Sequence, residues 1–130
     1  MDIQKFSKEE IARCQIETAL ELFTRQGDLF SVITLAGAAE EILGQLLRGR
    51  RGKLPLPGAL TSIFRILRPG GKKNDPEAGL QAHEIDDFVH LDPRHEAVFL
   101  VGRAIEDYVA LCGAPSASMV KFLNELPGKG

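Results

Sequence analysis

Apolar positions recur at helical spacing along most of the chain, and they are densest between residues 28 and 47, DLFSVITLAGAAEEILGQLL. The first half of this stretch is apolar on nearly every side of a helix, and the second half narrows to one stripe. The residues of the stripe are Leu35, Ala39, Ile42, Leu43, Leu46 and Leu47. A helix that is apolar all round is surrounded by other protein, because exposing its surface costs roughly 25 cal/mol per Å². We therefore expect this stretch to be the central helix of a bundle.

Capping signals place another helix just before the central one. Ser7 and Glu10 have the spacing of a capping box, which predicts a helix that begins at this point. Gly27 suits the position just after a helix end, and Asp28 suits the N-cap of the next helix. Because the connection is so short, we expect the first two helices to be antiparallel neighbours.

Further helices are predicted along the remainder of the chain. They are expected over about 58–68, 75–86 and 93–112, and after Ser116 or Ser118. Asp92 and Pro93 are typical of a helix start, and Gly113 is typical of a helix stop. The chain has no alternation of apolar and polar residues long enough to predict a strand.

The bulk composition is that of one ordinary globular domain of 130 residues, 44% of them hydrophobic and 26% charged. We predict an all-α, single-domain, up-down bundle of five or six helices over residues 1–130, frayed at 1–6 and 127–130. Cys14 and Cys112 lie far apart and without zinc-binding spacing, so we expect reduced thiols. No secretory leader or long uncharged apolar run is recognisable, which predicts a cytoplasmic protein with no membrane partner.

Gly37 and Gly44 interrupt the central helix seven residues apart. Each interior glycine costs a helix about 1 kcal/mol relative to alanine, so a compensating interaction is expected. We expect another helix to approach closely along this side, either from the same chain or from a second copy. The chain is therefore expected to form a homodimer.

Basic residues are concentrated in the middle of the chain. No acidic residue lies between Glu41 and Asp75, and half of the sixteen basic residues fall in that window. The densest group is RGRRGK, which contributes Arg48, Arg50, Arg51 and Lys53. We interpret residues 48–53 as a loop that breaks the central helix, and one hypothesis is that it binds either phosphate, as in RNA or a nucleotide, or a protein partner. The alternative is a solvated loop that pairs with acidic helices of the same chain or of a second subunit.

Histidines and carboxylates form one dense polar group, HEIDDFVH, in which a helix would align His83, Asp87 and His90 on one face. Imidazole and carboxylate at this spacing suit a metal ion with open positions, so a metal-dependent hydrolase is one hypothesis. The stronger interpretation is that the helix ends before His90, because Asp92 and Pro93 follow closely. We therefore favour no metal site and expect no cofactor.

Two carboxylates, Glu40 and Glu41, lie within the apolar central helix. One hypothesis places at least one of them in a partly desolvated position, with a raised pKa or a buried cation as its partner. The alternative places both at the solvent edge of the helix. Elsewhere the chain has no P-loop, no nucleophile elbow and no zinc-protease motif.

Three segments, GDLFSVITLAGAAEEILGQLL, AHEIDDFVHLDP and AIEDYVALCG, together resemble small uncharacterised bacterial all-helical proteins of the HEPN-like type. The resemblance implies a helical bundle that dimerises, and many members are metal-independent ribonucleases with an Arg-x4–6-His motif at the dimer cleft. His83 falls where the motif's histidine is expected, but positions 76–78 are Pro76, Glu77 and Ala78. The arginine is therefore missing, and ribonuclease activity is not inferred.

These patterns favour a homodimeric binding or interaction module over an enzyme. One alternative is an RNA-binding protein or degenerate HEPN-like ribonuclease that uses residues 48–53 for phosphate and His83 in the cleft. The other is the metal-dependent hydrolase at His83, Asp87 and His90.

Overall fold

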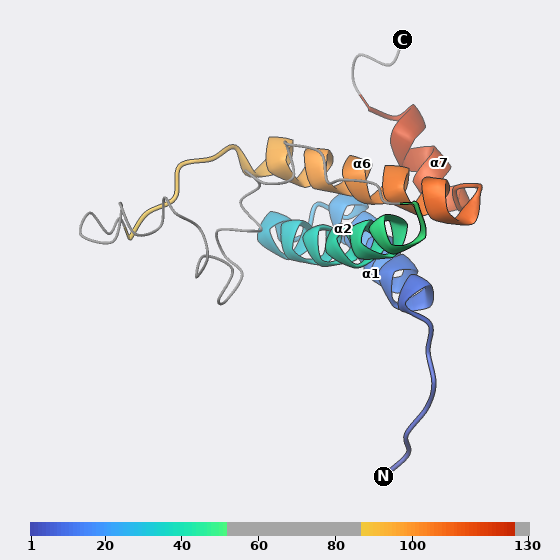
Figure 1. Cartoon of the computed structure of the whole chain (residues 1–130). Helices are drawn as coiled ribbons and strands as arrows, with labels where there is room; N and C mark the ends of the chain where they lie inside the picture. Colours follow the sequence, from blue (N-terminus) through green and yellow to red (C-terminus); the bar gives the residue numbers. More distant parts are fainter. Residues whose placement is uncertain (52–86, 127–130) are drawn as a thin grey trace.

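The computed structural model describes residues 1–51 and 87–126, and it is all-helical over these ranges. Its helices are α1 (Lys8–Thr24), α2 (Leu29–Arg51), α6 (Pro93–Cys112) and α7 (Ala117–Asn124). Figure 1 shows α1, α2 and α6 as a layered bundle, with α7 at one end. The helices predicted over 58–68 and 75–86 lie outside the described residues.

The predicted helix starts are confirmed by the hydrogen bonds that cap them. Ser7 and Glu10 form both bonds of the capping box at the start of α1. Asp28 accepts the first backbone N–H groups of α2, and Asp92 does the same for α6. Ser116 caps α7. Each of these side chains satisfies N–H groups that have no partner within their own helix.

The end of α1 differs from the prediction by one residue. Gln26, not Gly27, adopts the left-handed conformation, with φ of 58°. The N–H of Gly27 donates to the carbonyl of Leu22 at 2.7 Å, and the N–H of Gln26 donates to the carbonyl of Phe23 at 3.1 Å. This pair of bonds is a Schellman motif, in which Gln26 takes the position that glycine usually fills.

Helix α2 is the central helix, because it packs against both α1 and α6. Helices α1 and α2 are antiparallel, as expected, whereas α2 and α6 run in the same direction (Figure 1). The described neighbours thus alternate in direction between α1 and α2 but not between α2 and α6. A parallel pair of neighbours requires a long connection, and residues 52–92 lie between them in the sequence.

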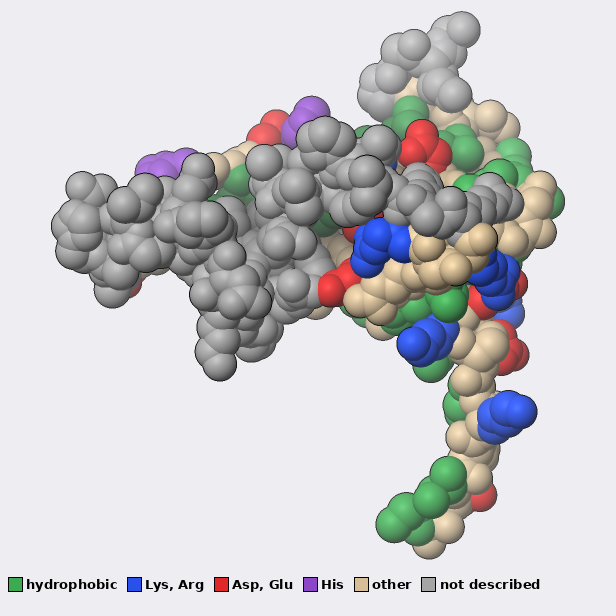
Figure 2. Space-filling view, viewed as in Figure 1, with side chains coloured by type: hydrophobic (Ala, Val, Ile, Leu, Met, Phe, Trp, Pro, Cys, Tyr) green, Lys and Arg blue, Asp and Glu red, His purple; other side chains and the backbone are tan. Residues whose placement is uncertain are grey.

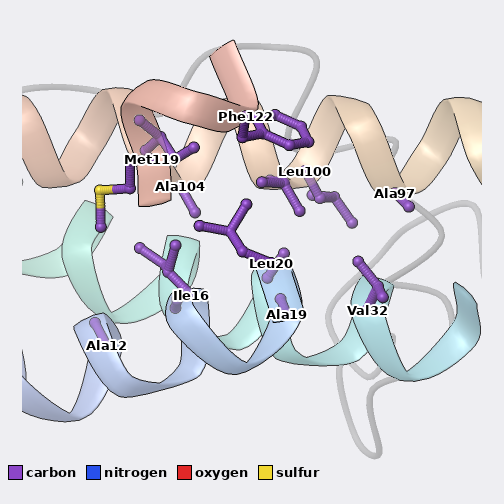
Figure 3. Packing of buried hydrophobic residues seen from close by; sticks show 14 of the residues in the cluster. Ala12, Ile16, Ala19, Leu20, Val32, Ala97, Leu100, Ala104, Met119 and Phe122 are labelled. Atoms are coloured by element: carbon purple, nitrogen blue, oxygen red, sulfur yellow. The ribbon is translucent and has the colours of Figure 1, made fainter. Parts of the chain in front are cut away.

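The core lies between α1, α2 and α6, and α7 covers one end of it. Figure 3 shows Ile16 and Leu20 of α1 directed toward α6 and α7. The fully buried large side chains include Ile16, Ile33, Leu43, Leu47, Leu100, Ile105 and Met119. Burial of each such side chain stabilises the fold by about 1.5–3 kcal/mol.

Helix α2 is less enclosed than the sequence predicted. Phe30, in the half expected to be covered on all sides, is 51% exposed. Close helix approach at Gly44 is also wrong, because a Cβ there would meet only side-chain atoms, at 3.5 Å or more. By length and composition, Leu29–Arg50 would also suffice to cross a membrane, a property shared with core helices of soluble proteins.

Candidate functional site

A charged cluster lies within the contact between α2 and α6. Arg103 Nη2 donates to Glu40 Oε2 at 3.2 Å, and the two side chains are only 8% and 14% exposed. Asp107, one turn beyond Arg103 on α6, is 1% exposed. Charges this deeply buried cost several kcal/mol each unless they are paired. Glu40, Arg103 and Asp107 are hereafter the charged cluster.

The parallel register of the two helices brings these side chains together. Arg103 and Asp107 are four residues apart and therefore share one face of α6. Glu40 and Gly44 have the same spacing on α2 and lie opposite them. A Cβ built on Gly44 would lie 3.8 Å from Glu40 Oε2 and 4.0 Å from Asp107 Oδ2. A methyl group at Gly44 would therefore lie in ordinary van der Waals contact with both carboxylates.

The pKa of Glu40 is raised above its ordinary value. Burial is the largest cause, and a hydrogen bond and charge repulsion from Asp107 add to it, while Arg103 opposes them. A hydrogen bond between the carboxyl groups of Glu40 and Asp107 requires that one of them carries a proton, because two ionised carboxylates have no proton to donate. The cluster therefore binds a proton more readily than an exposed glutamate does.

The Arg103 guanidinium is only partly satisfied. Its Nε and Nη1 atoms are buried and have no hydrogen-bond partner in the part of the chain that the structure describes. The nearest acidic group to Nη1 is Glu106 Oε1, at 3.9 Å, on a side chain that is 73% exposed. A buried donor without a hydrogen-bond partner costs about 1–3 kcal/mol, so the incomplete pairing of Arg103 lowers the stability of the fold.

A groove of about 560 Å³ runs beside Arg103 between α6 and α7. Its apolar lining consists of Val98, Phe99, Gly102, Ile105, Val109 and Leu123. Arg103 and Glu106 are its charged residues. We call this surface the α6–α7 groove. An apolar groove with a few polar groups is the usual form of a binding surface.

Gly102 keeps the α6–α7 groove open. A Cβ built on this residue would meet no heavy atom within 4 Å outside its own helix turn. A side chain added at Gly102 would therefore begin in open space beside the groove. The position therefore offers a direct way to block the groove.

A second and larger groove, of about 1120 Å³, lies where α1, α6 and α7 meet. Phe23 packs edge-on against Phe122 at 5.6 Å between ring centroids, and the Arg94 guanidinium lies 4.8 Å from the Phe23 ring. Ser116 and Ser118 both donate to the carboxylate of Glu17. These contacts fix α7 to α1, and they account for Glu17, Ser118 and Arg94 among the polar residues of this groove.

Cys112 is not an activated nucleophile. Its Sγ donates to Glu9 Oε2 at 2.9 Å. Burial and the neighbouring Glu9 carboxylate raise the pKa of the Cys112 thiol to about 11. Since the thiolate is the reactive form, this environment suppresses the reactivity of Cys112.

The predicted basic loop is wrong over its first four residues. Residues 48–51 form the last turn of α2, and Lys53 lies outside the described residues. Arg48 Nη1 would lie 3.5 Å from a Cβ on Gly44, and it therefore lies beside the charged cluster. Arg50 is exposed, and the side chain of Arg51 is not described.

The predicted histidine group is not assembled on a helix. His83 lies outside the described residues, and Asp87 and His90 are exposed in a segment without helix that ends at α6. A helical face through Asp87 and His90 is therefore wrong, for the reason that Asp92 and Pro93 begin a new helix. Among residues 1–51 and 87–126, no group of three metal-ligating side chains lies close together.

Of the two predicted glutamates, Glu40 faces α6 and has Arg103 as its cation. Glu41 is half-buried and also has an interaction partner. Arg103 and Asp107 were missed by the sequence reasoning. Their four-residue spacing within the stretch 97–112, where Glu106 is the only other charged residue, was the available signal.

No family model, no curated protein and no solved structure matches the chain.

Proposed function

We propose that this protein is a cytoplasmic homodimeric binding module that recognises its second copy through the α6–α7 groove. The observation that carries the proposal is the α6–α7 groove itself, whose lining is apolar except for Arg103 and Glu106. A second copy docked in the groove would bury this apolar lining, and the burial would favour association.

The balance of charges supports a protein occupant over a free anion. Three carboxyl groups, those of Glu40, Asp107 and Glu106, lie near two guanidinium groups, those of Arg103 and Arg48. An anionic ligand would be repelled by the carboxyl groups, whereas neutral backbone carbonyls would not. The groove is also open and mostly apolar, which suits side chains of a second protein surface.

Exposed apolar residues on the chain itself support self-association. Large apolar side chains outside the groove remain exposed, and they are Met1, Ile3, Phe6, Ile11, Phe30, Phe88, Val89 and Val120. A homodimer would let one copy cover the groove of the other with such residues. Both members of a dimer would then use the same pair of surfaces.

The test compares Gly102→Leu, which fills the groove, with Gly49→Leu, which is the matched control. A Cβ at either glycine would meet open space, and each replacement removes a helix glycine, which favours folding by about 0.5–1 kcal/mol. We expect light scattering at tens of micromolar to give a dimer for the wild type and for Gly49→Leu, and a dimer weakened about tenfold or more for Gly102→Leu. A monomeric wild type at this concentration contradicts the proposal.

A further inference from the structure

Two carboxyl groups lie close together within the contact between α2 and α6. Charged side chains form blue and red patches on the surface of the bundle in Figure 2, whereas Asp107 is only 1% exposed. The side chain of Glu40, on the facing helix, is 14% exposed. Glu40 Oε2 and Asp107 Oδ2 lie 3.8 Å and 4.0 Å from the same point, the Cβ position built on Gly44. The two carboxyl groups therefore meet largely out of water.

The hydrogen bond between these two carboxyl groups requires one proton. Arg103 does not remove this requirement, because only its Nη2 donates to Glu40, at 3.2 Å. The Nε and Nη1 atoms of Arg103 are buried and have no hydrogen-bond partner within the described residues. Burial and the neighbouring Asp107 together outweigh Arg103, so the pKa of Glu40 is raised above its ordinary value.

The other charged groups near the pair belong to the same two helices. Arg48 Nη1 lies 3.5 Å from the Cβ position of Gly44 and adds a positive charge, which favours ionisation of the pair. Glu41 on α2 and Glu106 on α6 add negative charge, which favours retention of the proton. The buried side chains of α1 and α7 are apolar, and they are Ala12, Ile16, Ala19, Leu20, Met119 and Phe122. The charge of the pair is therefore set within the α2–α6 contact.

We propose that Glu40 and Asp107 hold one proton between them, and that the α2–α6 contact loosens when this proton is lost. Loss of the proton leaves two negative charges side by side where water is largely excluded, and separation of the helices relieves their repulsion. No short connection opposes this separation, because α2 and α6 are parallel and residues 52–92 lie between them in the sequence (Figure 1). The contact is thus a pH-sensitive joint within the bundle. This inference does not depend on the proposed homodimer.

Hydrogen exchange of backbone amides tests whether the contact loosens. The full chain is compared at about pH 5 and about pH 8, after correction for the intrinsic effect of pH on exchange. We expect the protection of amides 40–47 and 100–107, relative to amides 16–20 of α1, to fall about tenfold or more at the higher pH, because one pKa unit corresponds to a tenfold change in an equilibrium. Equal protection of these amides at both pH values in the wild type would overturn the proposal.

Two isosteric substitutions test whether the proton of the pair is responsible. Glu40→Gln and Asp107→Asn each replace one carboxyl group by an amide, which donates to the remaining carboxylate without taking up a proton. We expect both variants to keep their protection at about pH 8. The control is Glu106→Gln, which should lose protection as the wild type does, because Glu106 is 73% exposed. If Glu40→Gln or Asp107→Asn loses protection to the same extent as the wild type, the pair does not control the contact.

Carbon-13 NMR of the side-chain carboxyl groups of the wild type shows whether the proton is shared. We expect the resonances of Glu40 and Asp107 to move in one common step above about pH 5, outside the range of exposed carboxylates. In Asp107→Asn, the step of Glu40 should move to lower pH. Full ionisation of both carboxyl groups at about pH 5 in the wild type would overturn the proposal without any variant. A Glu40 step with the same midpoint in Asp107→Asn would show that burial alone holds the proton, which contradicts the sharing.

Discussion

Arg103 Nη2 on α6 lies 3.2 Å from Glu40 Oε2 on α2, and the two residues are 63 positions apart in the sequence. This pair joins two parallel helices that no short connection holds together. Its burial makes it costly to break, because either partner left alone is a buried charge. The charged cluster therefore contributes to both the register of α2 on α6 and the position of Arg103 beside the groove.

Removal of the carboxylate should destabilise the fold. In Glu40→Ala, Arg103 loses its hydrogen-bonded anion while remaining buried, and we expect a loss of about 3 kcal/mol in the free energy of unfolding. Urea unfolding followed by circular dichroism measures this change. The control is Glu106→Gln, because Glu106 is 73% exposed and its ion pair at 3.9 Å should contribute less than about 1 kcal/mol. Equal losses in the two variants would contradict a special role for the buried pair.

Glu40 should also make stability depend on pH. Its pKa in the folded protein is raised above the ordinary value of 4.5, mainly by burial. The folded state thus favours the protonated carboxyl of Glu40. The stabilisation that results is fully present below the pKa of the unfolded chain, and it is lost as the pH rises through the pKa of the folded protein. Glu40→Gln imitates the protonated form at every pH. We expect the free energy of unfolding of the wild type, measured relative to that of Glu40→Gln, to increase as the pH falls from about 7 to about 5.

Unfolding curves of both proteins at the two pH values test this sign. If the free energies of unfolding of the wild type and Glu40→Gln differ by the same amount at both pH values, Glu40 does not titrate in this window. If Glu40→Gln becomes more stable relative to the wild type at the lower pH, the raised pKa of Glu40 is contradicted.

The turn after α1 offers a stabilising substitution. Gln26 has φ of 58°, which is strained for a residue with a Cβ and ordinary for glycine. Gln26→Gly should therefore increase the free energy of unfolding by about 0.5–1 kcal/mol, after allowance for the greater freedom of glycine in the unfolded chain. The neighbouring change Gly27→Ala should do the opposite, because its Cβ would lie 3.1 Å from Leu22 Cδ2 and 3.2 Å from the Leu22 carbonyl oxygen. Urea midpoints that move in the same direction for both variants would contradict this account of the turn.

Local signals predicted the helix ends well because caps depend on neighbouring residues. The bonds of Ser7, Asp28, Asp92 and Ser116 each span at most three residues. The predicted end of α2 was wrong because the segment RGRRGK was interpreted as a loop that breaks the helix. Arginines in a last turn instead interact favourably with the negative end of the helix dipole, which helps α2 to continue to Arg51.

The charged cluster could be predicted only in part. The position of Glu40 within an apolar helix indicated an unusual carboxylate. Its cation was not predictable from periodicity, because Arg103 lies on a parallel helix that is distant in the sequence. Arg103 and Asp107 are four residues apart and share one face of α6. The sequence does not show that Glu40 lies opposite them, because it does not give the register of α2 on α6.

Cys112 should be slow to react with alkylating reagents. With a pKa of about 11, only about one thiol in a thousand is ionised at about pH 8. Cys14 is exposed on α1 and is the natural internal comparison. Brief treatment with iodoacetamide, followed by peptide mass spectrometry, should modify Cys14 before Cys112. Glu9→Gln should accelerate the reaction of Cys112, because it removes a negative charge beside the thiol; an unchanged rate would assign the raised pKa to burial alone.

The basic residues at the end of α2 should bind RNA no more tightly than a non-specific surface does. Arg48 lies beside the carboxylates of Glu40 and Asp107, and a phosphate would have to compete with them. The C-terminal end of a helix also carries partial negative charge, which disfavours an anion near Arg50. We expect fluorescence titration of labelled single-stranded RNA at physiological salt to give a dissociation constant no tighter than about 1 µM. The triple substitution of Arg50, Arg51 and Lys53 by alanine should then change little, whereas tight, salt-sensitive binding lost in this variant would favour the RNA-binding alternative over the homodimeric module.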